Sequence, residues 1–140
     1  MSVSPALHAI LTADAGVSAL VAARVRPHMA WAEDDLPYVV YARISDVVGY
    51  HMGGEDGLYD ARYQLDCWAA TGEDAEALAE AVQSALSNYR GTAGPAGSQS
   101  HIRCVQMLSC SNDVQQKPTG SDEFLHRVMM DFRICYQDAD

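Results

Sequence analysis

Residues 124–136 read FLHRVMMDFRICY, and this stretch decides the fold. Apolar side chains and one histidine occupy every second position of the stretch, and charged side chains recur between them. Such alternation is typical of a β-strand with one buried face and one solvated face. At about 3.3 Å per residue the strand would be roughly 40 Å long, so we expect it to project beyond its own core or to pair with another chain.

Three further stretches are also predicted to be strands. Residues 58–69 alternate between apolar and polar side chains, and residues 37–44 are rich in β-branched and aromatic side chains. Residues 101–108 show a shorter pattern of the same kind. Together with residues 124–136, these stretches predict a sheet of about four antiparallel strands.

Helical patterns precede and interrupt the strands. Apolar residues at helical spacing before Pro27 predict two helices, with Ser4 and Asp14 as N-terminal caps. Thr71 is placed to cap the longest helix, and Gly91 to end it. The order is therefore α-α-β-β-α-β-β. It predicts an α+β fold in which helices pack on one face of the antiparallel sheet.

The composition fits one folded domain, 1–140, with 49% hydrophobic and 20% charged residues. A net charge of −10 argues against a protein that grips nucleic-acid phosphates. The sequence has neither an apolar run of membrane-spanning length nor the basic and apolar regions of a signal peptide, so we expect synthesis in a cytoplasm and no membrane partner. Glycine-rich or polar composition predicts mobile loops at 46–57, 91–100 and 109–123.

No known catalytic or phosphate-binding motif is present, so the sequence predicts no catalytic residue and no cofactor. The four cysteines, Cys67, Cys104, Cys110 and Cys135, lack the close paired spacing of a zinc site. Because disulfides are rare in a cytoplasm, they are interpreted as buried or idle thiols, and no metal site is predicted.

Charged residues within the strands allow two interpretations. The first is ordinary cross-strand pairing of Asp66 and Asp131 with neighbouring arginines. The available arginines each lie two or four residues from an acid in the same or an adjacent predicted strand, and they are Arg62, Arg127 and Arg133. Alternatively, the two carboxylates and a histidine could form the acid–base site of a small hydrolase.

A second cluster lies in the first predicted loop. His51, Glu55 and Asp56 could form a metal or acid–base site, or the two acids could hold a divalent cation between subunits, but a solvated loop is the preferred interpretation.

Several segments resemble one family along nearly the whole chain and in order. They are Ser4–Asp14, Val17–Val21, Arg24–Pro27, Leu36–Tyr41, Ala61–Ala69, Ala75–Leu86 and Arg127–Tyr136. The family is that of the tail-completion or tail-terminator proteins of long-tailed phages, prophages and gene-transfer particles.

The resemblance implies a structural protein made in the cytoplasm of a host bacterium and located in the virion, at the head-proximal end of the tail. It would form a ring of copies of itself, expected to be a hexamer, that ends growth of the tail tube and presents a joining surface. Its other partners would be the tail tube protein and the head connector or neck protein. DNA would pass through the bore without specific binding, and an acidic bore would repel its phosphates.

The resemblance brings no catalytic residues. By their positions alone, five charged residues of the strands are candidates for contacts between subunits or for cross-strand pairing, namely Arg62, Asp66, Arg127, Asp131 and Arg133. The loop residues His51, Glu55 and Asp56 are candidates for contact with the tail tube or with a neighbouring copy. Another neck, minor tail or head-completion protein on a similar scaffold is the structural alternative.

Overall fold

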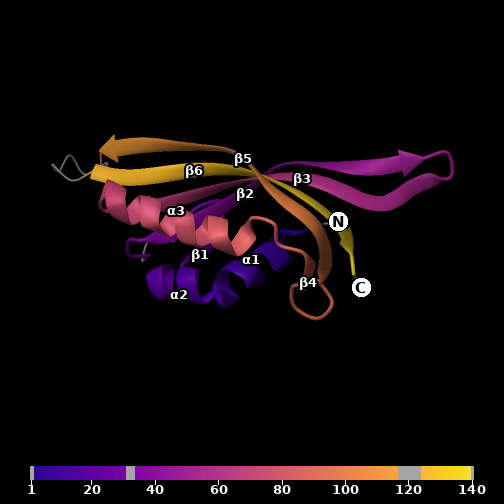
Figure 1. Ribbon diagram of the computed structural model, residues 1–140, viewed down its shortest axis with the longest axis horizontal. Coiled ribbons are helices and arrows are strands. Elements are labelled where there is room, and N and C mark those ends of the chain that lie inside the picture. Colours follow the sequence, from indigo (N-terminus) through magenta and orange to yellow (C-terminus); the bar gives the residue numbers. More distant parts are fainter. Residues whose placement is uncertain (1, 31–33, 117–123, 140) are drawn as a thin grey trace.

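The computed structural model describes residues 2–30, 34–116 and 124–139, and within them three helices accompany one six-stranded sheet (Figure 1). The helices are α1 (Ser4–Ala13), α2 (Ala15–Val21) and α3 (Gly72–Leu86). The strands are β1 (Val25–Pro27), β2 (Tyr38–His51), β3 (Gly54–Ala69), β4 (Gly91–Ala93), β5 (Ser100–Gln116) and β6 (Phe124–Asp138). Neighbouring strands follow the order β1-β2-β3-β6-β5-β4.

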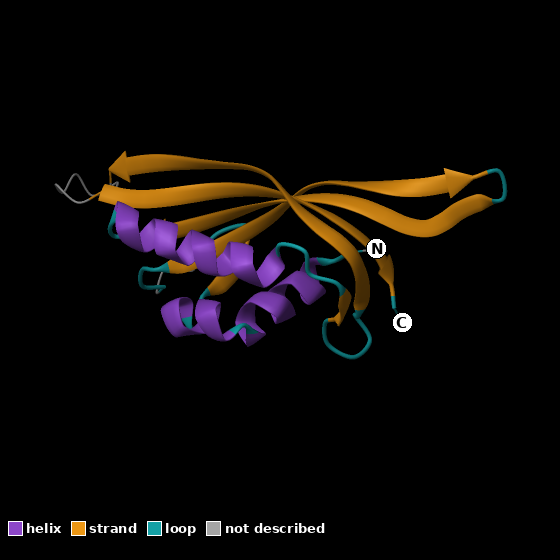
Figure 2. Ribbon diagram, in the orientation of Figure 1, coloured by secondary structure: helices purple, strands orange, loops and turns teal. Residues whose placement is uncertain are grey.

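The sheet corrects the predicted fold. It is a mixed, curled half-barrel of six strands among the described residues, because β1 runs parallel to β2 while the other neighbours are antiparallel. A four-stranded antiparallel sheet with helices packed on one face is therefore wrong. The two strands that were missed, β1 and β4, have three residues each, too few to show an alternating pattern. Figure 2 shows the helices within the curve of the sheet, below one half of its length.

The curl has a local cause in the long strands. Pairing of β2 with β3 shifts register between Arg43 and Ser45 and again between Val48 and Tyr50. Pairing of β5 with β6 shifts twice as well, at 102–104 and at 107–109. Such bulges bend a strand and increase its right-handed twist. Strands of 14 to 17 residues with these bulges wrap around the helices instead of remaining flat.

The loop predictions are partly wrong. Residues 46–57 belong mostly to β2 and β3, which continue as a two-stranded hairpin to a turn at Met52 and Gly53. Residues 109–116 belong to β5 and pair with β6, whereas 117–123 lie outside the described residues. Residues 94–99 carry no helix or strand, in agreement with the prediction there. The glycine and polar side chains of these segments give no alternating pattern in the sequence. Strands form there nonetheless, because pairing with a neighbouring strand satisfies the hydrogen bonds of the backbone N–H and C=O groups whatever the side chains are.

Two predicted helix caps are confirmed and one is wrong. The Asp14 carboxylate accepts a hydrogen bond from the Val17 amide at 3.0 Å, and the Thr71 hydroxyl accepts one from the Asp74 amide at 3.2 Å. Ser4 does not cap α1, because it is already the first helical residue. Its hydroxyl instead forms a 2.6 Å hydrogen bond with the hydroxyl of Tyr63, which ties α1 to the sheet.

The core lies between the curled sheet and the helices. Its largest fully buried side chains come from alternating positions of β3 and β6 and from α1 and α3; they include Tyr63, Tyr136, Phe132, Leu7, Leu11, Leu65, Leu78 and Leu86. β6 pairs with β3 on one side and with β5 on the other along most of its length. The strand that the sequence shows most clearly is thus an interior strand, which has no edge left for another chain.

Candidate functional site

The most prominent surface feature is a hairpin arm, which we define as residues 45–62 of β2 and β3. It extends well beyond the helices at one end of the molecule (Figure 1). Three large apolar side chains on it are more than 60% exposed, namely Val47, Tyr50 and Met52. Exposed apolar side chains gathered on one projecting element are typical of an interaction surface.

The predicted cluster of His51, Glu55 and Asp56 lies at the tip of this arm. His51 Nδ1 accepts a 2.9 Å hydrogen bond from the Gly53 amide, and Asp56 accepts one of 2.9 Å from the Leu58 amide. Glu55 lies opposite Tyr50 in the ladder. The polar groups of His51 and Asp56 therefore shape the turn. Among the residues that the structure describes, no group of three or more His, Cys, Asp or Glu side chains is arranged to hold a metal ion.

Both outer edges of the sheet are largely open. β1 pairs with β2 only from Val39 to Tyr41, so within the described chain no strand lies beside the outer edge of β2 beyond that point. β4 pairs with β5 only at 100–102, and Val105 of β5 accepts one further bond from Asn88. From there onward no described strand lies beside β5 on that side. Unpaired strand edges are templates for strand addition.

Exposed apolar side chains accompany both open edges. On β2, Ile44, Val47 and Tyr50 are 52%, 63% and 68% exposed, and on β5, Leu108 and Val114 are 50% and 55% exposed. The two edges lie on opposite sides of the same sheet. Within the described residues, the molecule thus has two different surfaces, each combining a strand edge that no other described strand covers with exposed apolar side chains.

The predicted charged residues of the strands lie on the sheet face turned away from the core. Arg62 of β3 donates to Asp131 of β6 at 2.7 Å, and Asp131 also accepts from Ser109. Arg133 of β6 binds both carboxylate oxygens of Asp60 in β3, at 2.7 to 3.0 Å. Two cross-strand ion pairs therefore link β3 to β6.

Arg127 forms the third cross-strand cluster. Its guanidinium donates to Asp113 of β5 at 2.7 Å, lies 3.8 Å from Asp66 of β3, and is 4.9 Å from the ring centre of Trp68. The hydrogen bond from Arg127 holds the pKa of the Asp113 carboxyl below its ordinary value. Asp113 was missed because its position lay in a predicted loop. A strand prediction through residue 116 would have placed it opposite Arg127.

This arrangement of Asp66 and Asp131 does not support the alternative prediction of a small hydrolase. Asp66 accepts from Gln64 and lies beside Arg127, while Asp131 is bound by Arg62 and Ser109. Among the hydrogen bonds of the described residues, none joins a histidine to either carboxylate. Both carboxylates act as acceptors within the sheet.

A buried polar contact anchors the arm. Tyr136 of β6 donates to Asp46 of β2 at 2.5 Å, and Arg43 lies 3.8 Å from the same carboxylate oxygen. Burial, followed by the bond to Asp46, raises the pKa of the Tyr136 hydroxyl. The side chain of Asp46 is only 3% exposed. Asp46 was missed because its partner lies 90 residues away in the sequence.

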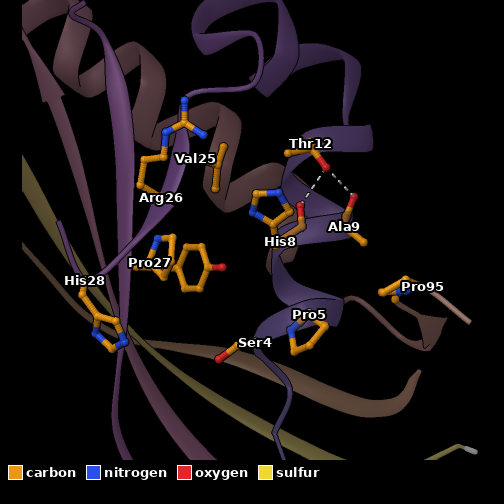
Figure 3. A pocket seen from close by; sticks show the side chains of 12 residues that line it. Ser4, Pro5, His8, Ala9, Thr12, Val25, Arg26, Pro27, His28 and Pro95 are labelled. Atoms are coloured by element: carbon orange, nitrogen blue, oxygen red, sulfur yellow. Dashed lines mark hydrogen bonds between the residues drawn. The ribbon is translucent and has the colours of Figure 1, made fainter. Parts of the chain in front are cut away.

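A groove of about 900 Å³ lies between α1 and the start of the sheet. In Figure 3, Pro5 and His8 of α1 line one side, and Pro27 and His28 line the other. The Thr12 hydroxyl at its rim donates to the backbone carbonyl of His8 at 2.8 Å, within the helix. The groove therefore presents a mainly apolar surface.

Within the described residues no single helix combines the length and apolar character needed to cross a membrane, although α1 and α2, bent by 83° at their junction, meet those criteria when taken together.

A curled mixed sheet with open edges and an apolar projecting arm has the features of a chain that assembles with other chains. A sequence model of the family described as "Tail completion protein gp17" matches residues 5–137, and the chain belongs to this family. It is therefore a structural protein of the phage tail, located in the virion. The family resemblance predicted from the sequence is confirmed.

A solved structure shares the fold. A chain from "Virion of native gene transfer agent (GTA) particle" superimposes with a TM-score of 0.66 at 18% identity, over 94% of this chain and 92% of that chain. A second solved chain aligns over 79% of this chain and 78% of its own length at 14% identity, but its TM-score of 0.44 is too low to support an argument. No curated protein sequence matches this chain significantly.

Proposed function

We propose that this tail-completion protein forms a closed ring, with six copies as the expected number, at the head-proximal end of the tail tube. The ring ends tube growth and presents the surface that joins the head connector or neck protein. Its role is structural and not enzymatic. The family match supports the tail location, and the fold shared with a chain from a gene transfer agent virion is consistent with it.

The observation that carries the ring is the pair of open edges on opposite sides of one sheet. A contact between two different surfaces of identical chains is head-to-tail, and it closes into a ring when the rotation per subunit divides a full turn. The outer edge of β2 in one copy pairs with the outer edge of β5 in the next. β6 plays no part in this pairing, because it is an interior strand.

Apolar side chains reinforce the same pairing. Val47 and Tyr50 on the arm would pack against Leu108 and Val114 of the neighbouring β5, because these side chains accompany the two edges that meet. In each chain they are at least half exposed, so the ring would bury apolar surface that the single chain leaves in water.

Charged residues of the sheet face are proposed to assist at the subunit boundary. Arg62 and Arg133 have side chains 50% and 45% exposed, so they can reach a neighbouring copy while keeping their internal partners. Three further charged residues are proposed to act indirectly, by stabilising the sheet face from which Arg62 and Arg133 project; they are Asp66, Arg127 and Asp131. His51, Glu55 and Asp56 are proposed contacts at the tip of the arm.

The bore is proposed to be acidic, so that DNA passes without adhering. On the sheet face, Asp60, Asp66, Asp113 and Asp131 are paired with three arginines, which leaves little net charge there. The net charge of −10 must therefore reside mainly elsewhere, for example in α3 and the tip of the arm. A reconstruction of the ring on a tail with a neutral or basic inner surface would contradict this proposal.

The decisive experiment is electron microscopy of particles from a phage or prophage that lacks this gene. The proposal expects DNA-filled heads beside unjoined tails of irregular length. Heads that have lost their DNA would indicate a head-completion protein instead, and normal infectious particles would contradict both structural functions.

Complementation with edge variants then tests the ring itself. Val47→Lys with Tyr50→Lys on β2, and separately Leu108→Lys on β5, should each fail to restore joined particles. Leu20→Lys is the matched control, because Leu20 is 39% exposed on α2, away from both edges. Full complementation by the two edge variants would contradict edge-to-edge pairing.

A further inference from the structure

Two of the four cysteines face each other across neighbouring strands. Cys104 of β5 lies directly opposite Cys135 of β6 in the antiparallel ladder, and the two thiols are within hydrogen-bonding reach. Both are half-buried, and neither is in a disulfide. The strands that carry them run side by side in Figure 1.

The register satisfies the main geometric requirement of a disulfide. Residues directly opposite in an antiparallel pair have Cα atoms about 4.5 to 5.5 Å apart. Disulfides span Cα separations of about 4.4 to 6.8 Å, so this register brings the two backbones within the range that a disulfide can bridge. The other cysteines lack such a partner, since Cys67 pairs with Val39 and Val128, and Cys110 pairs with Met130.

The surroundings suit a thiol pair that stays reduced until an oxidant is supplied. Burial, followed by the hydrogen bond to Cys104, raises the pKa of the Cys135 thiol to about 11, so the unreactive protonated form prevails near neutral pH. The Arg133 guanidinium, fixed by Asp60, lies close enough to both sulfurs to interact with them electrostatically. A thiolate formed during exchange is therefore stabilised by a neighbouring positive charge.

We propose that Cys104 and Cys135 form an intrachain disulfide once the virion leaves the reducing interior of the cell. The interior of a cell keeps thiols reduced, whereas the medium into which a virion is released is oxidising. The pair would then connect β5 to β6 at the bulge that follows Ile102, where the sheet curls.

The reaction proceeds by exchange with a low-molecular-weight disulfide. One cysteine thiolate attacks a sulfur of that molecule, forms a mixed disulfide and releases one small thiolate. The second thiolate attacks the mixed disulfide, so that the bond between Cys104 and Cys135 forms and the second small thiolate leaves. Two protein thiols lose their protons and are oxidised, and one external disulfide is reduced to two thiols.

The test uses the full chain, treated with oxidised glutathione and then alkylated under denaturing conditions. Mass spectrometry of peptides, without reduction, should show 104 linked to 135, while Cys67 and Cys110 carry the alkyl group. The melting temperature should rise by roughly 5–15 °C, because a cross-link between distant residues restricts the unfolded chain.

Matched variants separate this pair from other thiols. Cys104→Ser and Cys135→Ser should each abolish the temperature rise, and Cys110→Ser should retain it. Four alkylated cysteines after oxidation would overturn the proposal, as would a link between Cys110 residues of two chains with Cys104 and Cys135 still free. Released particles alkylated without reduction should likewise show the 104–135 link, and free thiols at both positions there would overturn its proposed place in the virion.

Discussion

The hydroxyl of Tyr136 donates a hydrogen bond to the carboxylate of Asp46 across 90 residues of sequence. It connects the interior strand β6 to β2 at the base of the hairpin arm, where the Tyr136 ring is fully buried and the Asp46 side chain is nearly so. The direction in which the arm leaves the body of the protein is therefore tied to the core.

Removing this hydroxyl should be costly. Tyr136→Phe leaves the Asp46 carboxylate buried without its hydrogen-bond donor, which costs about 1–3 kcal/mol of unfolding free energy. Urea denaturation measures the loss. Tyr50→Phe, which removes the hydroxyl of a tyrosine 68% exposed on the arm, is the control and should leave the midpoint unchanged. Equal midpoints for the two variants would show that the buried bond contributes no stability.

The arginines of the sheet face should differ in importance. Arg127→Ala removes a partly covered guanidinium from Asp113, Asp66 and Trp68, and should cost about 1–3 kcal/mol. Arg62→Ala removes a half-exposed partner of Asp131 and should cost at most about 1 kcal/mol.

Arg127→Lys distinguishes charge from geometry at the same position. Lysine keeps the positive charge but cannot reproduce the planar contact with Trp68, so it should restore only part of the stability. Thermal denaturation of the three variants gives the order. Full stability of Arg127→Lys would show that charge alone is needed.

Acid should weaken the same cluster through Asp113. Its pKa is lower in the folded chain than its ordinary value of 3.8, chiefly because of the hydrogen bond from Arg127. The stabilisation is therefore complete above the unfolded pKa and is lost as the pH falls through the lowered folded pKa. Between about pH 5 and pH 2, Asp113→Asn should flatten the decline in melting temperature relative to the unmodified chain. Asp35→Asn, at an exposed aspartate, should not, and equal slopes for both variants would contradict the assignment.

Shortening the arm should separate folding from assembly. Val48 and Tyr59 are direct cross-strand partners, so residues 49–58 can be replaced by Asn-Gly, a two-residue turn suited to a hairpin. The melting temperature should change by only a few degrees, because the exposed end of the arm adds little to the core. Particles complemented with this variant should carry unjoined tails.

The control for the shortened arm keeps its length. Gly57→Asn, at a positive φ that asparagine tolerates and with open space around it, preserves the length and the apolar side chains of the arm and should restore joined particles. Joined particles with the shortened arm would show that assembly does not use it.

Much of the core could be predicted because its pattern is local. The alternation in β3 and β6 marks which side chains are buried. Asp14 and Thr71 mark the starts of two helices, because each side chain accepts a hydrogen bond from an amide only three residues further along the chain. The cross-strand pairing of Arg62 with Asp131 was an expected possibility, because both lay on the polar positions of predicted strands.

The remaining features depend on partners distant in sequence. β1 and β4 can be recognised as strands only from their pairing with β2 and β5. The end of the arm was not predicted, because its glycine-rich sequence is typical of a loop. The curl arises from bulges, which are properties of register between two strands and not of one segment. Contacts such as Asp46 with Tyr136 follow only after that register is known.

The interior position of β6 also affects how the chain folds during synthesis. Every other strand of the sheet leaves the ribosome before β6, yet β6 must insert between β3 and β5. Until it does, β1-β2-β3 and β4-β5 remain two separate half-sheets, each with an additional unpaired edge. Closure of the sheet is therefore a long-range step that waits for the synthesis of β6, and a nascent chain cut short before residue 124 cannot complete the sheet whose two outer edges form the proposed ring contacts.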